Sequence, residues 1–214
     1  MKKSAITFVC FFGVVFATYP QAGYKPATEL QQKEIMKKIT EASEQMKTLQ
    51  CDFIQKKTFS ILEEELLSEG HMYFKQKNKI RWEYNKPYLF EFVMNIDKIM
   101  IKSEGTKNIM DVNASKIFSE MSKMIVAGIS GTGIFDPSKF SSKFMMGTKD
   151  NMVILTPKQK EIKQLFKVIT IYFNLSDYTV SSVEIEELNG DKTFIKMRNK
   201  QLNKTLSDEI FTIQ

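Results

Sequence analysis

Cysteine is scarce in this chain of 214 residues, which contains only Cys10 and Cys51. Cys10 lies in an N-terminal segment that we expect to be removed, which leaves one cysteine and excludes a disulfide within the mature chain. The fold must therefore be stabilised by its own hydrophobic core. We expect Cys51 to behave as a buried apolar residue and not as a reactive thiol.

Histidine is rarer still, since His71 is the only one. We expect its side chain to be exposed to solvent. Neither a His-x-x-x-His nor a Cys-x-x-Cys spacing occurs, so we expect no metal site. The GISGTG stretch (128–133) lacks the glycine spacing of a nucleophile elbow and of a phosphate-binding loop, so we expect no cofactor either. Glu184 and Glu186 have the spacing of a solvent-facing strand surface. We therefore predict that the protein is not an enzyme.

Proline and glycine are also few, with five and nine residues. No linker rich in either residue divides the chain, which predicts a single domain over residues 18–214. Before it, Lys2 and Lys3 precede a mostly apolar run over residues 5–17, the composition of a secretory signal. We predict a signal peptide over residues 1–17, with cleavage as late as about residue 22. A retained N-terminal anchor is the alternative.

Charge of both signs is spread along the chain. The formal net charge of +6 falls to +4 if Lys2 and Lys3 are removed with the signal. Acidic residues are interleaved with basic ones nearly everywhere, so we expect no nucleic-acid partner. For an exported protein, a moderately basic surface fits anionic lipid headgroups or an acidic partner better.

A helix is predicted over residues 28–48. Apolar residues recur there at three- and four-residue spacing with Lys and Glu between them, which is typical of an amphipathic helix. Thr28 is a suitable N-cap, and Pro26 just upstream disfavours an earlier start. The helix therefore offers one apolar stripe to the rest of the domain.

From Cys51 onward the apolar period approaches two, which indicates strands. Turn signals separate them, among them NLSD (174–177) and LNGD (188–191). Roughly ten short strands at this spacing predict a strongly curved antiparallel sheet. The expected strands include the segments around Phe53, Phe74, Trp82, Phe92, Met100 and Ile109, followed by Asn151–Thr156, Leu165–Asn174, Thr179–Leu188, Lys192–Asn199 and Glu209–Ile213.

One helical segment interrupts the strands. Within residues 114–131, apolar residues recur at helical spacing, namely Ile117, Met121, Met124 and Ile125. Glycines follow, and a second, short helix is predicted over Asp136–Phe140, with Asp136 as its cap and Pro137 at its first position. A methionine-rich helix flanked by glycines and inserted between two blocks of strands has the character of a lid.

A sheet of this size encloses more volume than its inward side chains fill, because about eight strands already leave room for a small ligand. Two helices with one apolar stripe each can cover its open side. We therefore predict a mainly β fold, a half-open antiparallel β-barrel of about 10–11 strands with a helical lid. Methionines crowd the middle of the chain and suit a wall that adapts to varied apolar shapes. The alternative is that the same residues fill a solid core.

Several short motifs in this order resemble the outer-membrane lipoprotein carrier family, the LolA-like proteins. They are FIQK (53–56), a strand opened by Gly70, RWEY (81–84) followed by Pro87, the helical insertion, and LTPK (155–158). The similarity covers roughly residues 30–213. The resemblance implies a protein that holds the acyl chains of lipoproteins in a hydrophobic cavity and shuttles them across the periplasm from the inner to the outer membrane.

The resemblance also implies where the cavity lies. Trp82 matches a position whose ring points into the family's cavity, and Ile80 and Tyr84 share its strand face. From the residues and the resemblance together, we expect the acyl chains to contact Phe53, Ile80, Trp82, Tyr84, Phe90, Phe92, Met100, Met121, Met124 and Ile125. The expected partners are lipoproteins, an inner-membrane lipoprotein-releasing complex and an outer-membrane acceptor, and the carrier is expected to be a monomer.

Two positions depart from the family pattern. Better-studied members have Arg-Pro after the glycine-opened strand, with the arginine bonded to the lid, where this chain has Gln76-Lys77. Arg81 and Lys77 are the candidate replacements for that latch, and a less favoured closed state is the alternative. The family's Asp-Gly turn before a lysine is replaced by Ile96-Asp97-Lys98.

Other functions are compatible with the same scaffold. An outer-membrane acceptor would normally be anchored through a cysteine directly after its signal, and Cys10 is poorly placed for that. An envelope-stress sensor would usually carry a second domain, for which little chain is left. A secreted hydrolase would need a cluster of polar residues in the pocket.

Overall fold

The computed structural model describes residues 23–62, 64–114, 116–131 and 133–213. The predicted signal peptide over residues 1–17 lies outside them and stays a prediction.

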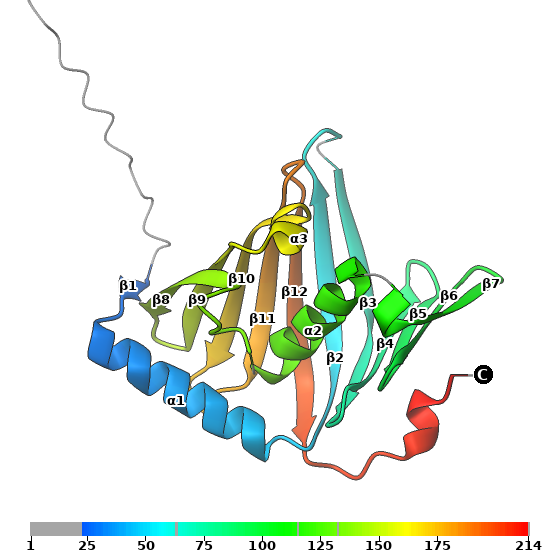
Figure 1. The fold of residues 1–214 in the computed structure, drawn as a ribbon, viewed down its shortest axis with the longest axis horizontal. Coiled ribbons are helices and arrows are strands. Elements are labelled where there is room, and N and C mark those ends of the chain that lie inside the picture. The colour runs from blue at the N-terminus through cyan, green and yellow to red at the C-terminus, as the bar shows by residue number, and fades with distance from the viewer. Residues whose placement is uncertain (1–22, 63, 115, 132, 214) are drawn as a thin grey trace, which may run out of the picture.

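Twelve strands within the described residues form one antiparallel sheet, in the order β1-β8-β9-β10-β11-β12-β2-β3-β4-β5-β6-β7 (Figure 1). Its edges, β1 and β7, are not paired with each other, so the sheet stays open. The strands are β1 (Lys25–Pro26), β2 (Thr48–Phe59), β3 (Glu64–Lys75), β4 (Lys79–Lys86), β5 (Phe90–Asn95), β6 (Lys98–Ser103), β7 (Thr106–Asp111), β8 (Phe140–Met146), β9 (Asp150–Pro157), β10 (Phe166–Asn174), β11 (Val180–Glu187) and β12 (Lys192–Leu202).

Two longer helices cross one face of this sheet (Figure 1). The helical elements are α1 (Glu29–Gln45), η1 (Val112–Ala114, a 3-10 turn), α2 (Lys116–Ser130), α3 (Lys160–Lys163) and η2 (Asp208–Phe211, a 3-10 turn). The predicted architecture, an open antiparallel barrel with a helical lid, is confirmed. The number of strands is higher than expected, because β1 and β8 were not recognised in the sequence.

The first helix begins where the sequence predicts. Thr28 forms a capping box with Gln31, in which each side chain accepts a hydrogen bond from the other residue's backbone N–H. The helix ends before Thr48, which belongs to β2 and donates its hydroxyl to the Lys204 carbonyl. Ile35 and Ile39 on its buried face join the main core.

The end of α2 is fixed against α1 by a glycine. Gly131 has a φ of 79°, a left-handed conformation that favours glycine. A Cβ there would lie 2.8 Å from Ile39 Cγ2 and 3.5 Å from Phe173 Cε1. The backbone therefore passes directly over α1 and β10 at this point, which brings both helices to the same face of the sheet.

Two local predictions are wrong. Asp136–Phe140 was expected to be a short helix, but it forms a single turn in which Asp136 Oδ1 accepts from the Ser138 backbone N–H. The turn ends at Phe140 because this residue starts β8 and pairs with Pro157 of β9. Buried apolar residues on β8, including Phe140 and Phe144, supply the packing that holds the segment extended.

Glu209–Ile213 was expected to be a strand, but its first three residues belong to the 3-10 turn η2 (Asp208–Phe211). The side chain of Phe211 is fully buried there, and Arg81 Nη1 donates to the Ile210 carbonyl at 3.1 Å. Lys75 and Lys79 both bond to Asp208 at 2.9 Å. The segment therefore packs across β4 and β5 instead of adding a strand beside them.

Candidate functional site

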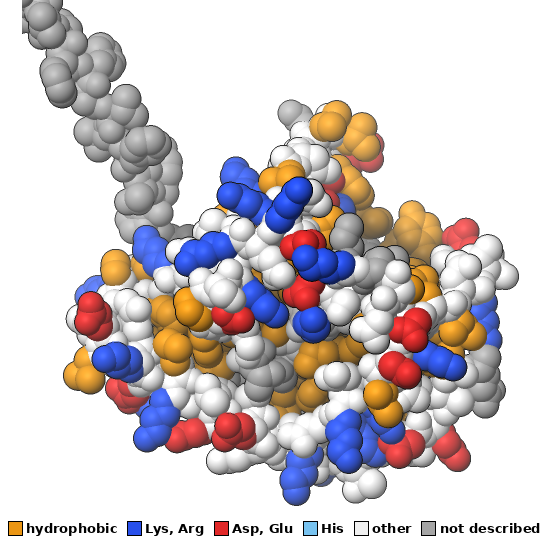
Figure 2. Space-filling model, in the orientation of Figure 1, with side chains coloured by type: hydrophobic (Ala, Val, Ile, Leu, Met, Phe, Trp, Pro, Cys, Tyr) orange, Lys and Arg blue, Asp and Glu red, His pale blue; other side chains and the backbone are white. Residues whose placement is uncertain are grey.

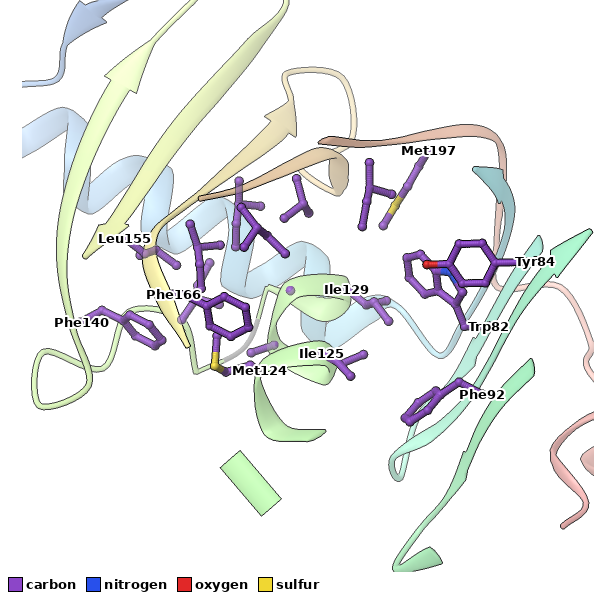
Figure 3. Close-up of a pocket in the computed structure, with 18 of the residues that line it drawn as sticks. Trp82, Tyr84, Phe92, Met124, Ile125, Ile129, Phe140, Leu155, Phe166 and Met197 are labelled. Carbon is purple, nitrogen blue, oxygen red and sulfur yellow. The ribbon is translucent and has the colours of Figure 1, made fainter. Parts of the chain in front are cut away.

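An apolar cavity of about 310 Å³ lies between α2 and the sheet. The structure thus has a cavity where a solid core was the alternative. No charged residue lines it among the described residues. Its lining consists of Trp82, Tyr84, Phe90, Phe92, Met124, Ile125, Ala127, Gly128, Ile129, Ile134, Phe140, Leu155, Phe166, Ile169, Ile171, Val183, Ile185, Ile195 and Met197. Figure 3 shows most of these side chains projecting toward a shared space from opposite sides.

Alternation along the strands produces this wall. Side chains two residues apart point to the same face of a sheet. Five strands each contribute such a pair to the cavity: Trp82 and Tyr84, Phe90 and Phe92, Ile169 and Ile171, Val183 and Ile185, and Ile195 and Met197. The charged residues between them consequently face the other side of the sheet.

Six of the ten side chains expected at the cavity lie there. Trp82, Tyr84, Phe90 and Phe92 come from β4 and β5, and Met124 and Ile125 come from α2. Figure 3 places Trp82, Tyr84 and Phe92 on one side and Phe140 and Leu155 on the other, with α2 between them. Their role in acyl-chain binding is taken up under the proposed function.

Phe53 and Ile80 are not part of the lining. Phe53 is 1% exposed and lies behind the wall, in contact with Trp82 and Tyr84 at ring-centroid distances of 4.6 and 5.0 Å. Ile80 shares the strand face of Trp82 but is fully buried between Phe74 and Met94, its partners on β3 and β5. Both residues therefore support the wall from within the core.

Met100 lies on the opposite face of the sheet. It pairs with Val93, whereas Ile101 pairs with the cavity residue Phe92, and alternation therefore turns Met100 away from the cavity. Its side chain lines a separate hollow beside Glu209 and Thr212 of the C-terminal segment. The side chain of Met121 lies outside the described part of the structure.

The far half of the wall was missed in the sequence. The strands β8–β12 and the segment from Ala127 to Ile134 supply most of the lining, and none of these residues was expected at the cavity. The alternating pairs Ile169 and Ile171, and Val183 and Ile185, were visible as strand patterns. Nothing local shows that they face the same cavity as Trp82, because that depends on how far the sheet curves.

Four aromatic rings are in contact on one side of the cavity, where Trp82, Tyr84 and Phe90 line the wall and Phe53 lies behind it. Phe53 contacts Trp82 and Tyr84, and Tyr84 contacts Phe90 edge-on at 5.6 Å. The Tyr84 hydroxyl donates to Gln55 Oε1 at 2.8 Å. Burial raises the pKa of the Tyr84 phenol to about 12, so it stays protonated in ordinary buffers.

Ion pairs hold α2 in place. Lys116 pairs with Glu161 of α3, and Glu120 pairs with Lys139, just before β8, at 3.6 Å. Glu120 is 8% exposed and is also bonded by Lys123 at 2.8 Å, which lowers the pKa of its carboxyl. Figure 2 shows hydrophobic side chains gathered around α2, with charged ones of both signs over the rest of that face.

Neither candidate for the family's latch reaches α2. Arg81 bonds to Glu83 and Glu91 and faces the C-terminal segment. Lys77 occupies the β3–β4 turn with a φ of 68°. The observed anchors of α2 are therefore the glutamate–lysine pairs, which the sequence did not single out.

The remaining candidate residues lie outside the cavity. His71 is half-exposed, and its Nδ1 lies 2.7 Å from Asp52 Oδ1. Cys51 is 5% exposed, as expected, and burial raises its thiol pKa to about 12. Glu186 pairs with Lys167 on the outer face of the sheet. In the described ranges no cluster of His, Cys, Asp or Glu is arranged to hold a metal ion.

The fold and the cavity define a class of open-barrel proteins with an apolar binding space under a helical lid. Residues 44–214 match the model of the family described as outer membrane lipoprotein carrier protein LolA, and the chain belongs to this family. No protein of curated function gives a significant match to the chain. No helix in the described part of the chain has the length and apolarity needed to span a membrane.

Solved structures share the fold at low identity. A MucB structure has a TM-score of 0.52 and 11% identity over 89% of this chain and 65% of that chain. An uncharacterized conserved protein from Thermus thermophilus has a TM-score of 0.51 and 12% identity over 86% of this chain and 94% of that chain. The Pseudomonas aeruginosa MucA/MucB complex has a TM-score of 0.50 and 9% identity over 85% of this chain and 60% of that chain. The chain spans less than two thirds of the matched chain in both MucB structures.

Proposed function

We propose that this protein is a periplasmic carrier that binds the acyl chains of lipoproteins in the cavity under α2 and shuttles them from the inner to the outer membrane. The observation that supports this function is the cavity itself, whose wall is almost entirely apolar, in a chain of the LolA family. The residues proposed to contact the acyl chains include Trp82, Phe92 and Met124.

The energetics fit a carrier without a catalytic step. Each CH₂ group left in water costs about 0.8 kcal/mol, so a lipid anchor does not cross an aqueous space unaided. An apolar wall of comparable area offsets that cost and makes transfer reversible. No bond has to be made or broken, which is consistent with a proposed role in binding and not in catalysis.

Loading is proposed to move α2. The cavity of about 310 Å³ lies at the low end of the roughly 300–1,000 Å³ found for ligand pockets. Met124, Ile125 and Ile129 of α2 occupy the wall that acyl chains would contact. The chains and the helix therefore compete for the same apolar surface, which couples loading to displacement of α2.

The proposed partners follow from this cycle. A lipoprotein-releasing complex of the inner membrane would load the carrier, and an outer-membrane acceptor would unload it, with the carrier acting as a monomer. The fold match to MucB, which is seen in complex with MucA, favours a second candidate function, a sensor that binds a partner protein. A sensor would bind acyl chains without moving them between membranes.

A transfer assay tests the proposal. Inner-membrane vesicles, which contain a triacylated lipoprotein and the proposed releasing complex, are incubated with the protein, and lipoprotein in the vesicle-free supernatant is measured. We expect stoichiometric release by the wild type and loss of release with Met124→Asp, because a carboxylate in the apolar wall is strongly disfavoured. Ile109→Asp, at a half-exposed position on β7, is the matched control and should release normally. Absence of release by the folded wild type would contradict a shuttling role.

A further inference from the structure

One residue of the cavity wall carries an unsatisfied polar group. The Nε1–H group of Trp82 is buried and has no acceptor with hydrogen-bond geometry among the described residues. Buried donors in native proteins are nearly always bonded, and leaving one unpaired is costly. A lone donor in an apolar wall therefore points to a ligand that brings its own acceptor.

A second polar group, the Tyr84 hydroxyl, lies on the same side of the cavity. The Tyr84 hydroxyl donates to Gln55 Oε1, which leaves the lone pairs of the hydroxyl oxygen available. The indole N–H of Trp82 lies close to the Tyr84 hydroxyl and favours its ionised form, which offsets part of the rise in the Tyr84 pKa. The N–H group nevertheless has no acceptor at normal hydrogen-bond geometry. Figure 3 shows the two rings next to each other, on the side facing Leu155 and Phe140. The cavity thus has one weakly polar end within an otherwise hydrocarbon surface.

The indole is held in position. Phe53 packs against it at 4.6 Å with a tilt of 43° between the ring planes. On the neighbouring strands, Met72 and Phe92 are the residues directly opposite Trp82. A donor on a ring held in this way loses little further freedom when it bonds a ligand, which favours affinity.

We propose that the Trp82 N–H group, beside Tyr84, donates a hydrogen bond to the ester or amide carbonyl oxygen of a bound acyl chain. This inference rests on the proposed function and adds which part of the cargo is recognised. A carbonyl oxygen is the acceptor nearest to the hydrocarbon of an acyl chain. A phosphate or carboxylate does not suit this site, because no cationic side chain lines the cavity among the described residues.

The consequence is a preference for acyl over alkyl chains. A diacylglycerol and the dialkylglycerol ether with the same chain lengths bury the same hydrocarbon, but only the diacylglycerol has carbonyl groups. One added hydrogen bond corresponds to a preference of about fivefold to tenfold. Trp82→Phe removes the donor while keeping a ring at that position.

The proposal is tested by measuring the dissociation constants of both lipids for the wild type, for Trp82→Phe and for the control Phe92→Leu. We expect the wild type to favour the diacylglycerol by about fivefold to tenfold, Trp82→Phe to bind both lipids nearly equally, and Phe92→Leu to weaken both while keeping the preference. The infrared band of an isotope-labelled ester carbonyl should lie at lower frequency when bound to the wild type than to Trp82→Phe.

The outcomes separate the two proposals. Equal affinity of the wild type for both lipids, or an undiminished preference in Trp82→Phe, would overturn the carbonyl site while leaving an acyl-binding cavity intact. Binding of neither lipid by the wild type would overturn the proposed function together with the inference that rests on it.

Discussion

Phe53 of β2 packs its ring against Trp82 of β4, with the centroids 4.6 Å apart. The two residues lie on strands separated by β3. Phe53 pairs with Gly70 of β3, and because Gly70 has no side chain, the Phe53 ring has room to lie over this strand and reach Trp82. Phe53 is buried in the core, whereas Trp82 faces the cavity. The core and the cavity wall are thus one continuous aromatic structure.

Truncating Phe53 should destabilise the fold. Phe53→Ala removes the contacts to Trp82 and Tyr84 and leaves a void in the core, so we expect the free energy of unfolding to fall by about 3–5 kcal/mol. Urea denaturation followed by circular dichroism measures it. Phe194→Ala, at a 36% exposed position on the adjacent strand β12, is the control and should cost less than about 1 kcal/mol. Similar losses in both variants would contradict the placement of Phe53.

Adding a methyl group at Gly70 should separate β3 from β4. A Cβ there would lie 1.8 Å from the Glu83 carbonyl oxygen and 2.8 Å from Phe53 Cζ. Because the backbone at Glu83 must shift to make room, we expect Gly70→Ala to lower the free energy of unfolding by about 3 kcal/mol, the upper end of the usual cost of overpacking. Gly128→Ala on α2, where no atom lies within 4 Å of the new Cβ, should stabilise the helix by about 0.5–1 kcal/mol. A tolerated Gly70→Ala would show that the two strands are not so close.

The contact of α2 with the sheet should weaken in acid. The lysines at 123 and 139 hold the pKa of Glu120 below its usual value of 4.5. The contacts of the Glu120 carboxylate with these two lysines therefore stabilise the folded state fully above about pH 4.5. Their contribution is lost as the pH falls through the lower pKa that Glu120 has in the folded protein. Hydrogen exchange of the α2 amides, corrected for intrinsic rates, should become faster below that pH.

Glu120→Gln should show fast α2 exchange already at neutral pH, with little further change in acid. Glu41→Gln removes an exposed glutamate that pairs with Lys37 on α1, and it should leave α2 exchange unaltered. An identical pH dependence in wild type and Glu120→Gln would assign the acid effect to other groups.

Cys51 should react with thiol reagents only after unfolding. It is buried, and burial raises the pKa of its thiol to about 12, so almost no thiolate is present at about pH 8. Ellman's reagent should therefore label the native protein, prepared without residues 1–17 and hence without Cys10, slowly and the urea-unfolded protein at once. Ser176→Cys, in an exposed turn, provides a native-state control that reacts immediately. Fast labelling of native wild type would contradict the burial of Cys51.

Much of the local structure could be predicted from the sequence. Thr28 and the helical spacing after it fixed the start of α1, and apolar alternation revealed most strands, because both patterns reflect neighbouring residues. Trp82 was assigned to the cavity through the resemblance to the family, and strand alternation, which is local, placed Tyr84 on the same face and Phe90 on the same face as Phe92. Met100 was misassigned by one residue, which on a strand moves a side chain to the opposite face.

Other features depend on contacts between distant segments. The C-terminal segment is held across β4 and β5 by Lys75, Lys79 and Arg81, and no local pattern shows that it will not form a strand. Glu120 anchors α2 through Lys139, a residue outside the helix. Ile80 is excluded from the cavity by its neighbours on the adjacent strands, although its sequence pattern is that of Trp82.

The order of the amino acids was enough to establish the periodicities, the strand faces, the two amphipathic helices and the resemblance to the family. Only the folded chain shows where the helices leave the sheet uncovered, and therefore which apolar side chains enclose space and which fill the core. This division arises because hydrophobicity is a property of each residue, whereas a cavity exists only where residues from distant strands fail to meet.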